Sequence, residues 1–138
     1  YKDSSTVFDD FLTCLDYFGG KDFSLLQGIT THMTASVLLG ARGVTPALAA
    51  IFPSIFVKLY AACERQDMDA VVVLNPIMRR AQELLGMSKN PTAVLKYAAS
   101  LQLRSNTKVI SPQESLSKEE EVLIKKKFDE VAELVSGI

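Results

Sequence analysis

The chain is poor in the residues that most often bind metal ions or form covalent cross-links. Its 138 residues include two cysteines, Cys14 and Cys63, and one histidine, His32. The cysteines form no CxxC pair and have no histidine at ligand spacing, which argues against both a zinc site and a disulfide framework. Because both cysteines fall in predicted helices, we expect buried free thiols.

An excess of charge of one sign is also lacking. There are 15 lysines and arginines and 16 aspartates and glutamates, which leaves a formal net charge of -1. This balance gives no electrostatic reason to expect a nucleic-acid or anionic-membrane partner. No uninterrupted apolar run reaches the roughly 18 residues of a membrane-spanning helix, and no charged-then-apolar leader opens the chain. We therefore expect no nucleic acid, no membrane and a cytoplasmic location.

The chain does contain enough apolar residues for a core, since 48% are hydrophobic and 22% are charged. This composition is typical of one soluble globular piece. Apolar residues at helical spacing predict a helix over residues 8–18, and the pair Gly19-Gly20 follows where the helix would end. A short apolar run over 23–26, ended by Gly28, predicts a strand.

The alternation of helix and strand continues beyond Gly28. The pair Thr30-Thr31 is expected to cap a helix over residues 32–39. Gly40 and Gly43 then bracket a tight connection into a second short strand over 44–48. Strands that alternate with helices indicate a parallel sheet, and hence an α/β fold.

From Pro53 onward the sequence predicts helices only. After the one that begins at Pro53, we predict helices over residues 69–85, 91–103 and 118–135. Pro76 is expected to kink the first of these three or to divide it in two. Two caps support the others: Asn90 before Pro91, and a capping box formed by Ser117 and Glu120.

Three segments stand at the predicted strand ends: residues 1–5 (Tyr-Lys-Asp-Ser-Ser), 23–28 (Phe-Ser-Leu-Leu-Gln-Gly) and 39–47 (Leu-Gly-Ala-Arg-Gly-Val-Thr-Pro-Ala). Together they resemble the sixth, seventh and eighth strands of the dihydrodipicolinate synthase / N-acetylneuraminate lyase family. The resemblance implies a TIM (β/α)8 barrel, which usually needs about 250 residues, so this chain can supply only its later part. Residues 1–66 would be the C-terminal part of the barrel, and 67–138 a C-terminal helical extension packing on it.

Lys2 carries the chemistry that the resemblance implies. It begins the run Lys-Asp-Ser-Ser, which resembles the family's strand end Lys-Asp-Ser-Ser-Gly-Asp, with Thr6 and Val7 in place of the last two residues. In the family this lysine forms a Schiff base with a 2-oxo acid. An ordinary lysine ammonium has a pKa of about 10.4, and only the free amine attacks a ketone, so we expect Lys2 to be buried at the mouth of the barrel.

Other positions have weaker implied roles. Gly28 matches a family glycine whose missing Cβ lets substrate approach the backbone, although an ordinary turn glycine is an alternative. Thr45 falls where the family's eighth strand offers a main-chain carbonyl to the substrate pocket. Ser4 and Ser5 are expected to cap the following helix.

His32 invites assignment as a general base, but a packed, non-catalytic histidine is favoured. In the family, proton transfer is attributed to a tyrosine from an earlier strand, and Tyr1, Tyr17, Tyr60 and Tyr97 do not match its position. The family's pair of hydroxyl residues that binds the substrate carboxylate is also missing. The chain by itself is therefore not expected to catalyse.

The implied activity is that of a class I lyase or aldolase that joins pyruvate, or another 2-oxo acid, to an aldehyde, or separates them. The resemblance implies no metal, no organic cofactor and a homotetramer. Ile29, Thr30 and Thr31 replace the acidic residues found there in sialic-acid lyases, which favours a short 2-keto-3-deoxy or hydroxy-oxo acid; a dihydrodipicolinate synthase-like role stays open. Two alternatives also remain: a non-catalytic or regulatory homologue, and a half-barrel that pairs with its own copy.

Overall fold

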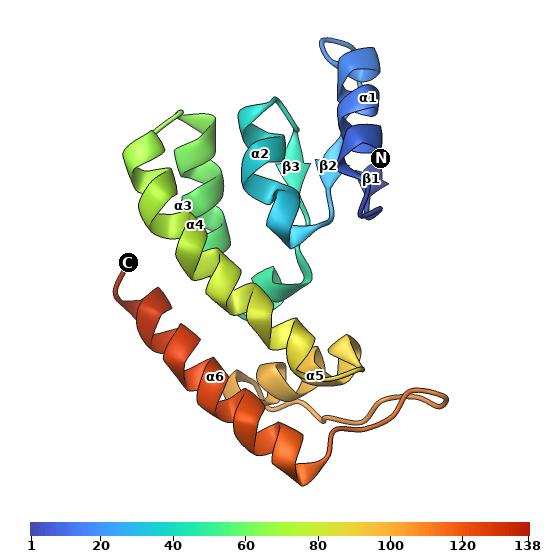
Figure 1. Cartoon of the computed structure of the whole chain (residues 1–138), viewed down its shortest axis with the longest axis vertical. Coiled ribbons are helices and arrows are strands. Elements are labelled where there is room, and N and C mark those ends of the chain that lie inside the picture. Colours follow the sequence, from blue (N-terminus) through green and yellow to red (C-terminus); the bar gives the residue numbers. More distant parts are fainter.

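The computed structural model describes residues 1–138, and it begins with three short parallel strands (Figure 1). The strands are β1 (Lys2–Asp3), β2 (Leu26–Gln27) and β3 (Gly43–Val44), and they lie in the order β1-β2-β3. A helix follows each of the first two: α1 (Phe8–Phe18) after β1 and α2 (Met33–Leu38) after β2. The parallel α/β arrangement predicted from the sequence is confirmed.

The remainder of the chain is helical. Four longer helices follow the sheet: α3 (Pro53–Glu64), α4 (Met68–Gln82), α5 (Pro91–Gln102) and α6 (Lys118–Ser136). Short 3-10 turns occupy Thr30–His32, Ala47–Ala50 and Glu83–Met87. Helices α3 and α4 pack side by side, and α6 runs along α4 and α5 at the end of the molecule opposite α1 (Figure 1). None of the helices is both long and apolar enough to cross a membrane.

The hydrophobic core is unevenly divided between the helices and the sheet. One cluster of 20 buried residues joins α2 to the four later helices, with Leu59, Met78, Leu84 and Ile124 wholly buried. A second cluster holds only Phe11, Leu25 and Ala41, under α1. Burial of apolar area is the main stabilising term in folding, so the helical part is held more strongly than the part containing β1 and α1.

Several predicted helix ends are confirmed. The Gly19 N–H donates to the Leu15 carbonyl at 2.7 Å at the end of α1. Gly40 follows α2 with a φ of 104°, a backbone conformation that glycine adopts without the steric cost of a Cβ. The Asn90 side chain accepts from the Ala93 N–H at 3.3 Å, and the capping box of Ser117 and Glu120 is complete.

The predicted strand bounds were wrong in both cases. The strand expected over 23–26 is limited to Leu26–Gln27, because ladder pairing with β1 begins only where the Leu26 N–H meets the Tyr1 carbonyl. The strand expected over 44–48 ends at Val44. Pro46 has no N–H to extend the ladder, and the small residues Ala47–Ala50 form a 3-10 turn instead.

Two predicted caps were also wrong. Helix α1 begins after Val7 without a side-chain cap, and the Ser5 hydroxyl instead donates to the Asp3 carboxylate at 3.1 Å. Thr30 and Thr31 do not cap α2, because both lie within the 3-10 turn that leads into it.

Pro76 does not divide its helix, contrary to one of the two predicted outcomes. Helix α4 is continuous from Met68 to Gln82 with Pro76 inside it, and Glu83–Met87 continues as a 3-10 turn. Pro76 is exposed at the groove between α4 and α6, and the helix loses the one hydrogen bond that an N–H at this position would make. Of the two free cysteines, Cys63 is buried as predicted, and burial raises its thiol pKa. Cys14 is only half-buried.

The capping box of α6 makes a measurable prediction. Replacing Ser117 with alanine removes the oxygen that accepts the Glu120 N–H at 3.2 Å. We expect Ser117→Ala to lower the free energy of unfolding by about 1 kcal/mol, as for other serine N-caps. Chemical denaturation monitored by circular dichroism measures this loss. Ser115→Ala, an exposed loop change two residues earlier, is the matched control, and an equal effect of the two substitutions would contradict the assignment.

Candidate active site

The three predicted site residues lie near the carboxyl ends of the three adjacent strands. Lys2 pairs with Leu26, and Leu26 pairs with Gly43. Two residues further along each strand, Gly28 and Thr45 lie directly after β2 and β3. Since the strands are parallel, their carboxyl ends meet at one edge of the sheet, as they do at the substrate-binding face of α/β barrels. The fold therefore brings Lys2, Gly28 and Thr45 to the same region.

Backbone hydrogen bonds hold this edge together just beyond the strands. The Gly28 N–H donates to the Asp3 carbonyl at 2.6 Å. The Thr45 N–H donates to the Gln27 carbonyl at 2.9 Å. These bonds extend the strand pairing beyond the assigned strands. Backbone hydrogen bonds therefore fix the positions of Lys2, Gly28 and Thr45 relative to one another along the strand direction.

The two faces of the sheet differ in what they carry. Successive strand residues point to opposite faces, so Lys2, Leu26 and Gly43 share one face, and Asp3 and Gln27 the other. Asp3 is 6% exposed and Gln27 is 1% exposed, on the side covered by the helices. The face of Lys2 is open, and it would be the interior face if the sheet closed into a barrel.

The side chain of Lys2 crosses the backbone at Gly28. A Cβ placed on Gly28 would lie 2.7 Å from the Lys2 Cε and 2.6 Å from the Asp3 carbonyl oxygen, and would also clash with the Ser4 hydroxyl. Gly28 does not have a positive φ, so the requirement for glycine is one of space. The missing Cβ makes room for the lysine itself, a role that was not predicted from the sequence.

Lys2 is exposed in this chain, and the expected burial is not observed. The reason is that no other part of the 138 residues covers the open face of the sheet. Its Nζ makes no hydrogen bond or ion pair within the chain. Thr45 is likewise exposed, so neither the Lys2 nor the Thr45 side chain is enclosed by the residues present.

Two polar side chains on the covered face were missed by the sequence analysis. The Asp3 carboxylate accepts from the Ser5 N–H at 2.9 Å, and the Gln27 Oε1 accepts from the Ile29 N–H at 2.7 Å. For Asp3 a signal was available, since aspartate often bonds to the backbone two residues ahead in a turn. Nothing in the local sequence marks Gln27, whose role depends on its burial.

His32 lies on the turn between β2 and α2. Its ring is half-buried, with its centroid 5.0 Å from that of Phe8, and its Nδ1 is buried without a hydrogen-bond partner. The ring is therefore packed, as the sequence analysis favoured, and its non-catalytic role stays a prediction. No group of three or more His, Cys, Asp or Glu side chains is placed to hold a metal ion.

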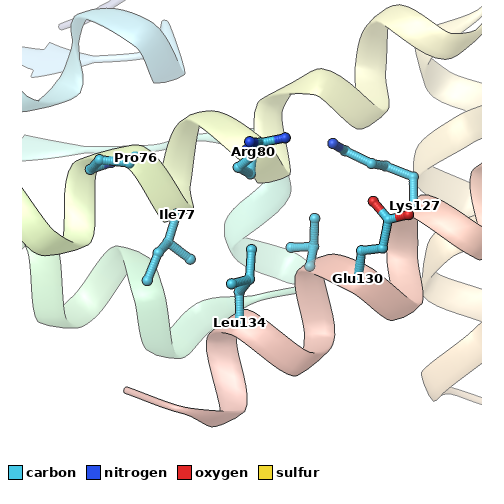
Figure 2. A pocket seen from close by; sticks show the side chains of 7 residues that line it. Pro76, Ile77, Arg80, Lys127, Glu130 and Leu134 are labelled. Carbon is cyan, nitrogen blue, oxygen red and sulfur yellow. The ribbon is translucent and has the colours of Figure 1, made fainter.

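Several grooves lie elsewhere on the molecule. A groove of about 240 Å³ between α4 and α6 has Ile77 and Leu134 on its walls and Arg80, Lys127 and Glu130 at its rim (Figure 2). There Lys127 forms an ion pair with Glu83, and its hydrogen bond lowers the pKa of the Glu83 carboxyl.

A second groove, of about 400 Å³, lies against the open edge of β3 and is lined mainly by α3 and the turn before it. Neither groove includes Lys2, Gly28 or Thr45 in its lining. The strand ends are the candidate active site because of the strand register and the path of the Lys2 side chain past Gly28.

The chain spans less than half the length of the solved structures that it matches. Dihydrodipicolinate synthase from Bacteroides thetaiotaomicron is 29% identical, with a TM-score of 0.88, over 94% of this chain and 45% of that one. YagE, a prophage protein of the dihydrodipicolinic acid synthase family from E. coli K12 solved with pyruvate, is 20% identical, with a TM-score of 0.84, over 95% and 45%. N-acetylneuraminate lyase from Proteus mirabilis is 19% identical, with a TM-score of 0.80, over 94% and 43%.

Because YagE and the Proteus mirabilis lyase are only 20% and 19% identical to this chain, their similarity shows a shared fold alone. These relatives are TIM-barrel proteins, so the three parallel strands and their helices correspond to part of such a barrel. Comparison with curated proteins gave no match. The sequence model of the Dihydrodipicolinate synthetase family matches residues 2–131, which is nearly the whole chain. With this match and the lysine-bearing strand end described above, the chain belongs to the dihydrodipicolinate synthetase family.

Proposed function

We propose that this chain is the carboxyl-terminal part of a class I lyase in which Lys2 forms a Schiff base with pyruvate or another 2-oxo acid. In this proposal β1, β2 and β3 are the sixth, seventh and eighth barrel strands, and residues 67–138 are a helical extension. The observation that carries it is the path of the Lys2 side chain across Gly28 at the carboxyl ends of the strands. The amine there faces the side of the sheet that becomes the barrel interior on closure.

The proposed reaction begins with attack of the neutral Lys2 amine on the ketone carbon of the 2-oxo acid. A C–N bond forms, the ketone oxygen leaves as water, and the resulting imine is protonated on nitrogen. In the synthetic direction, a base supplied by the rest of the barrel takes a proton from the adjacent carbon, and the C–H electron pair moves toward the protonated imine to give an enamine. The enamine carbon then bonds to the aldehyde carbon, whose oxygen takes up a proton. Cleavage runs these steps in reverse. Gly28 and the Thr45 backbone would border the bound 2-oxo acid.

The amine must be free of its proton for this step, and burial is what favours the neutral form of a lysine. Lys2 is exposed in this chain. Further strands, closing the sheet over the open face, would remove water from the ammonium and favour its neutral form. In this proposal, the rest of the barrel buries the Lys2 side chain. The family's tyrosine and carboxylate-binding hydroxyls would come from the same part.

The choice of substrate follows from the residues after β2. Ile29, Thr30 and Thr31 carry no charge, and Thr30 is buried, so this loop offers no carboxylate to a polyhydroxylated substrate. A short 2-keto-3-deoxy or hydroxy-oxo acid fits better, and one structural relative is a 2-keto-3-deoxygluconate aldolase from Sulfolobus solfataricus. A dihydrodipicolinate synthase-like condensation stays open. The tetramer and the cytoplasmic location remain predictions.

A second candidate function is that of a non-catalytic or regulatory homologue that keeps the barrel. It would be favoured if the rest of the barrel lacks the catalytic tyrosine and the carboxylate-binding hydroxyls. The two candidates differ in one respect that can be measured, which is whether Lys2 reacts with a 2-oxo acid in the complete protein.

Borohydride trapping tests the main proposal. In the complete protein, incubation with pyruvate and sodium borohydride should reduce the imine and add a stable three-carbon adduct to the peptide that contains Lys2, detected by mass spectrometry. Lys2→Arg should abolish the adduct, because a guanidinium does not form it. Lys21→Arg, a change at an exposed lysine, should leave it intact. A label on another lysine, or no label with any 2-oxo acid, would favour the non-catalytic homologue.

Gly28→Ala tests the contact between Lys2 and Gly28. The new methyl group would lie 2.6 Å from the Asp3 carbonyl oxygen and 2.7 Å from the Lys2 Cε, so the strand end or the lysine must move. Since a displacement of about 1 Å can slow a positioned reaction by about 100-fold, we expect the trapping rate to fall by at least about tenfold. Gly86→Ala is the control, because a Cβ there meets nothing within 4 Å. Equal trapping rates in the two variants would remove the case for Gly28.

A further inference from the structure

The carboxyl ends of β1 and β2 share the same kind of side-chain to backbone hydrogen bond. Asp3 and Gln27 are register partners, both are buried, and both face the helices. The side chain of each accepts the backbone N–H two residues further along: Ser5 for Asp3 at 2.9 Å, and Ile29 for Gln27 at 2.7 Å. Each strand therefore turns at its end around a buried acceptor on the face opposite Lys2.

Gln27 is the more constrained of the two side chains. It is 1% exposed, and its Nε2 donates to the Ser36 hydroxyl of α2 at 3.1 Å while its Oε1 accepts from Ile29. Its backbone carbonyl also accepts from the Thr45 N–H. One residue thus joins β2, the turn after it, α2 and the end of β3.

The bonds on either side of Gly28 determine how its backbone lies under the lysine. The Gly28 N–H is held by the Asp3 carbonyl at 2.6 Å, and the next N–H, of Ile29, is held by Gln27. Both peptide groups that flank the Gly28 Cα are therefore oriented. Without the bond to Gln27, nothing would fix the second peptide group, and space at Gly28 is limited, since the Lys2 Cε lies 2.7 Å from where a Cβ would be.

We propose that Gln27 is a positioning residue for Lys2: by holding the Ile29 N–H on the covered face, it keeps the Gly28 backbone flat beneath the lysine on the open face. Asp3 does the same for the end of β1 that carries the lysine itself. This inference rests on the proposed function for its consequence in catalysis. The geometry it describes is independent of that function.

The competing interpretation is that Gln27 only anchors α2 through Ser36. The two bonds of the amide can be separated by mutation, because they use different atoms. Gln27→Met removes both bonds with little change in shape. Ser36→Ala removes only the bond to α2. Gln27→Glu keeps an acceptor for Ile29, and Ser36, whose hydroxyl can also donate, can bond to the other carboxyl oxygen.

The experiment compares these three variants in the complete protein by the rate and pyruvate dependence of borohydride trapping at Lys2. We expect Gln27→Met to lower the rate at saturating pyruvate by about tenfold or more, because the amine is no longer held in place. Gln27→Glu should recover most of that loss. Ser36→Ala should stay within about twofold of the unmodified rate, since positioning is intact. An equal loss in Ser36→Ala and Gln27→Met would overturn the proposal, as would an unchanged rate in Gln27→Met.

A second readout, without 2-oxo acid, separates this inference from the proposed function. Competitive acylation measures the reactivity of the Lys2 amine, and hydrogen–deuterium exchange measures the protection of the segment 26–32. Gln27→Met should change both, and Ser36→Ala should leave the acylation rate of Lys2 unchanged. If the unmodified protein is never trapped, the proposed function fails while these measurements still decide the role of Gln27. An unchanged acylation rate and unchanged exchange in Gln27→Met would overturn it.

Discussion

The hydrogen bond from the Gly28 N–H to the Asp3 carbonyl, 2.6 Å long, is the contact on which the arrangement of this site depends. It closes the parallel pairing of β1 and β2 at their carboxyl ends, and so brings Gly28 beside the strand that carries Lys2. Such a close approach of two backbones and a lysine side chain is possible only where a residue has no Cβ. The pairing of the strands and the glycine therefore depend on each other.

The distribution of the core explains why the site is open in this chain. The large cluster of 20 buried residues lies among α2 and the later helices, whereas the sheet is supported by three buried residues under α1. The helices cover one face of the sheet and leave the face of Lys2 without a covering layer. Completion of a barrel by other strands would both bury that face and pair the free edges of β1 and β3.

Features with a local cause were predicted well. The caps at Asn90 and Ser117 and the glycine end of α1 were found because the residues that form them lie within four positions of one another. The errors occurred where the same residue type is compatible with more than one local structure. Ser5 was expected to cap α1 but bonds to Asp3, and the run after Val44 was expected to be a strand although Pro46 ends the ladder. The strand of Gln27 was placed only approximately, and its side-chain bonds were not foreseen.

By itself the sequence determined the family, the alternation of strand and helix in the first half, and the presence of a lysine at the first strand end. These follow from residue types and spacings that are read along the chain. Only the tertiary structure decided that Lys2 crosses Gly28, that Asp3 and Gln27 are buried as register partners, and that the lysine is exposed in this chain. Each of these depends on the register between strands more than 20 residues apart, or on which face the helices cover, and no local pattern encodes either.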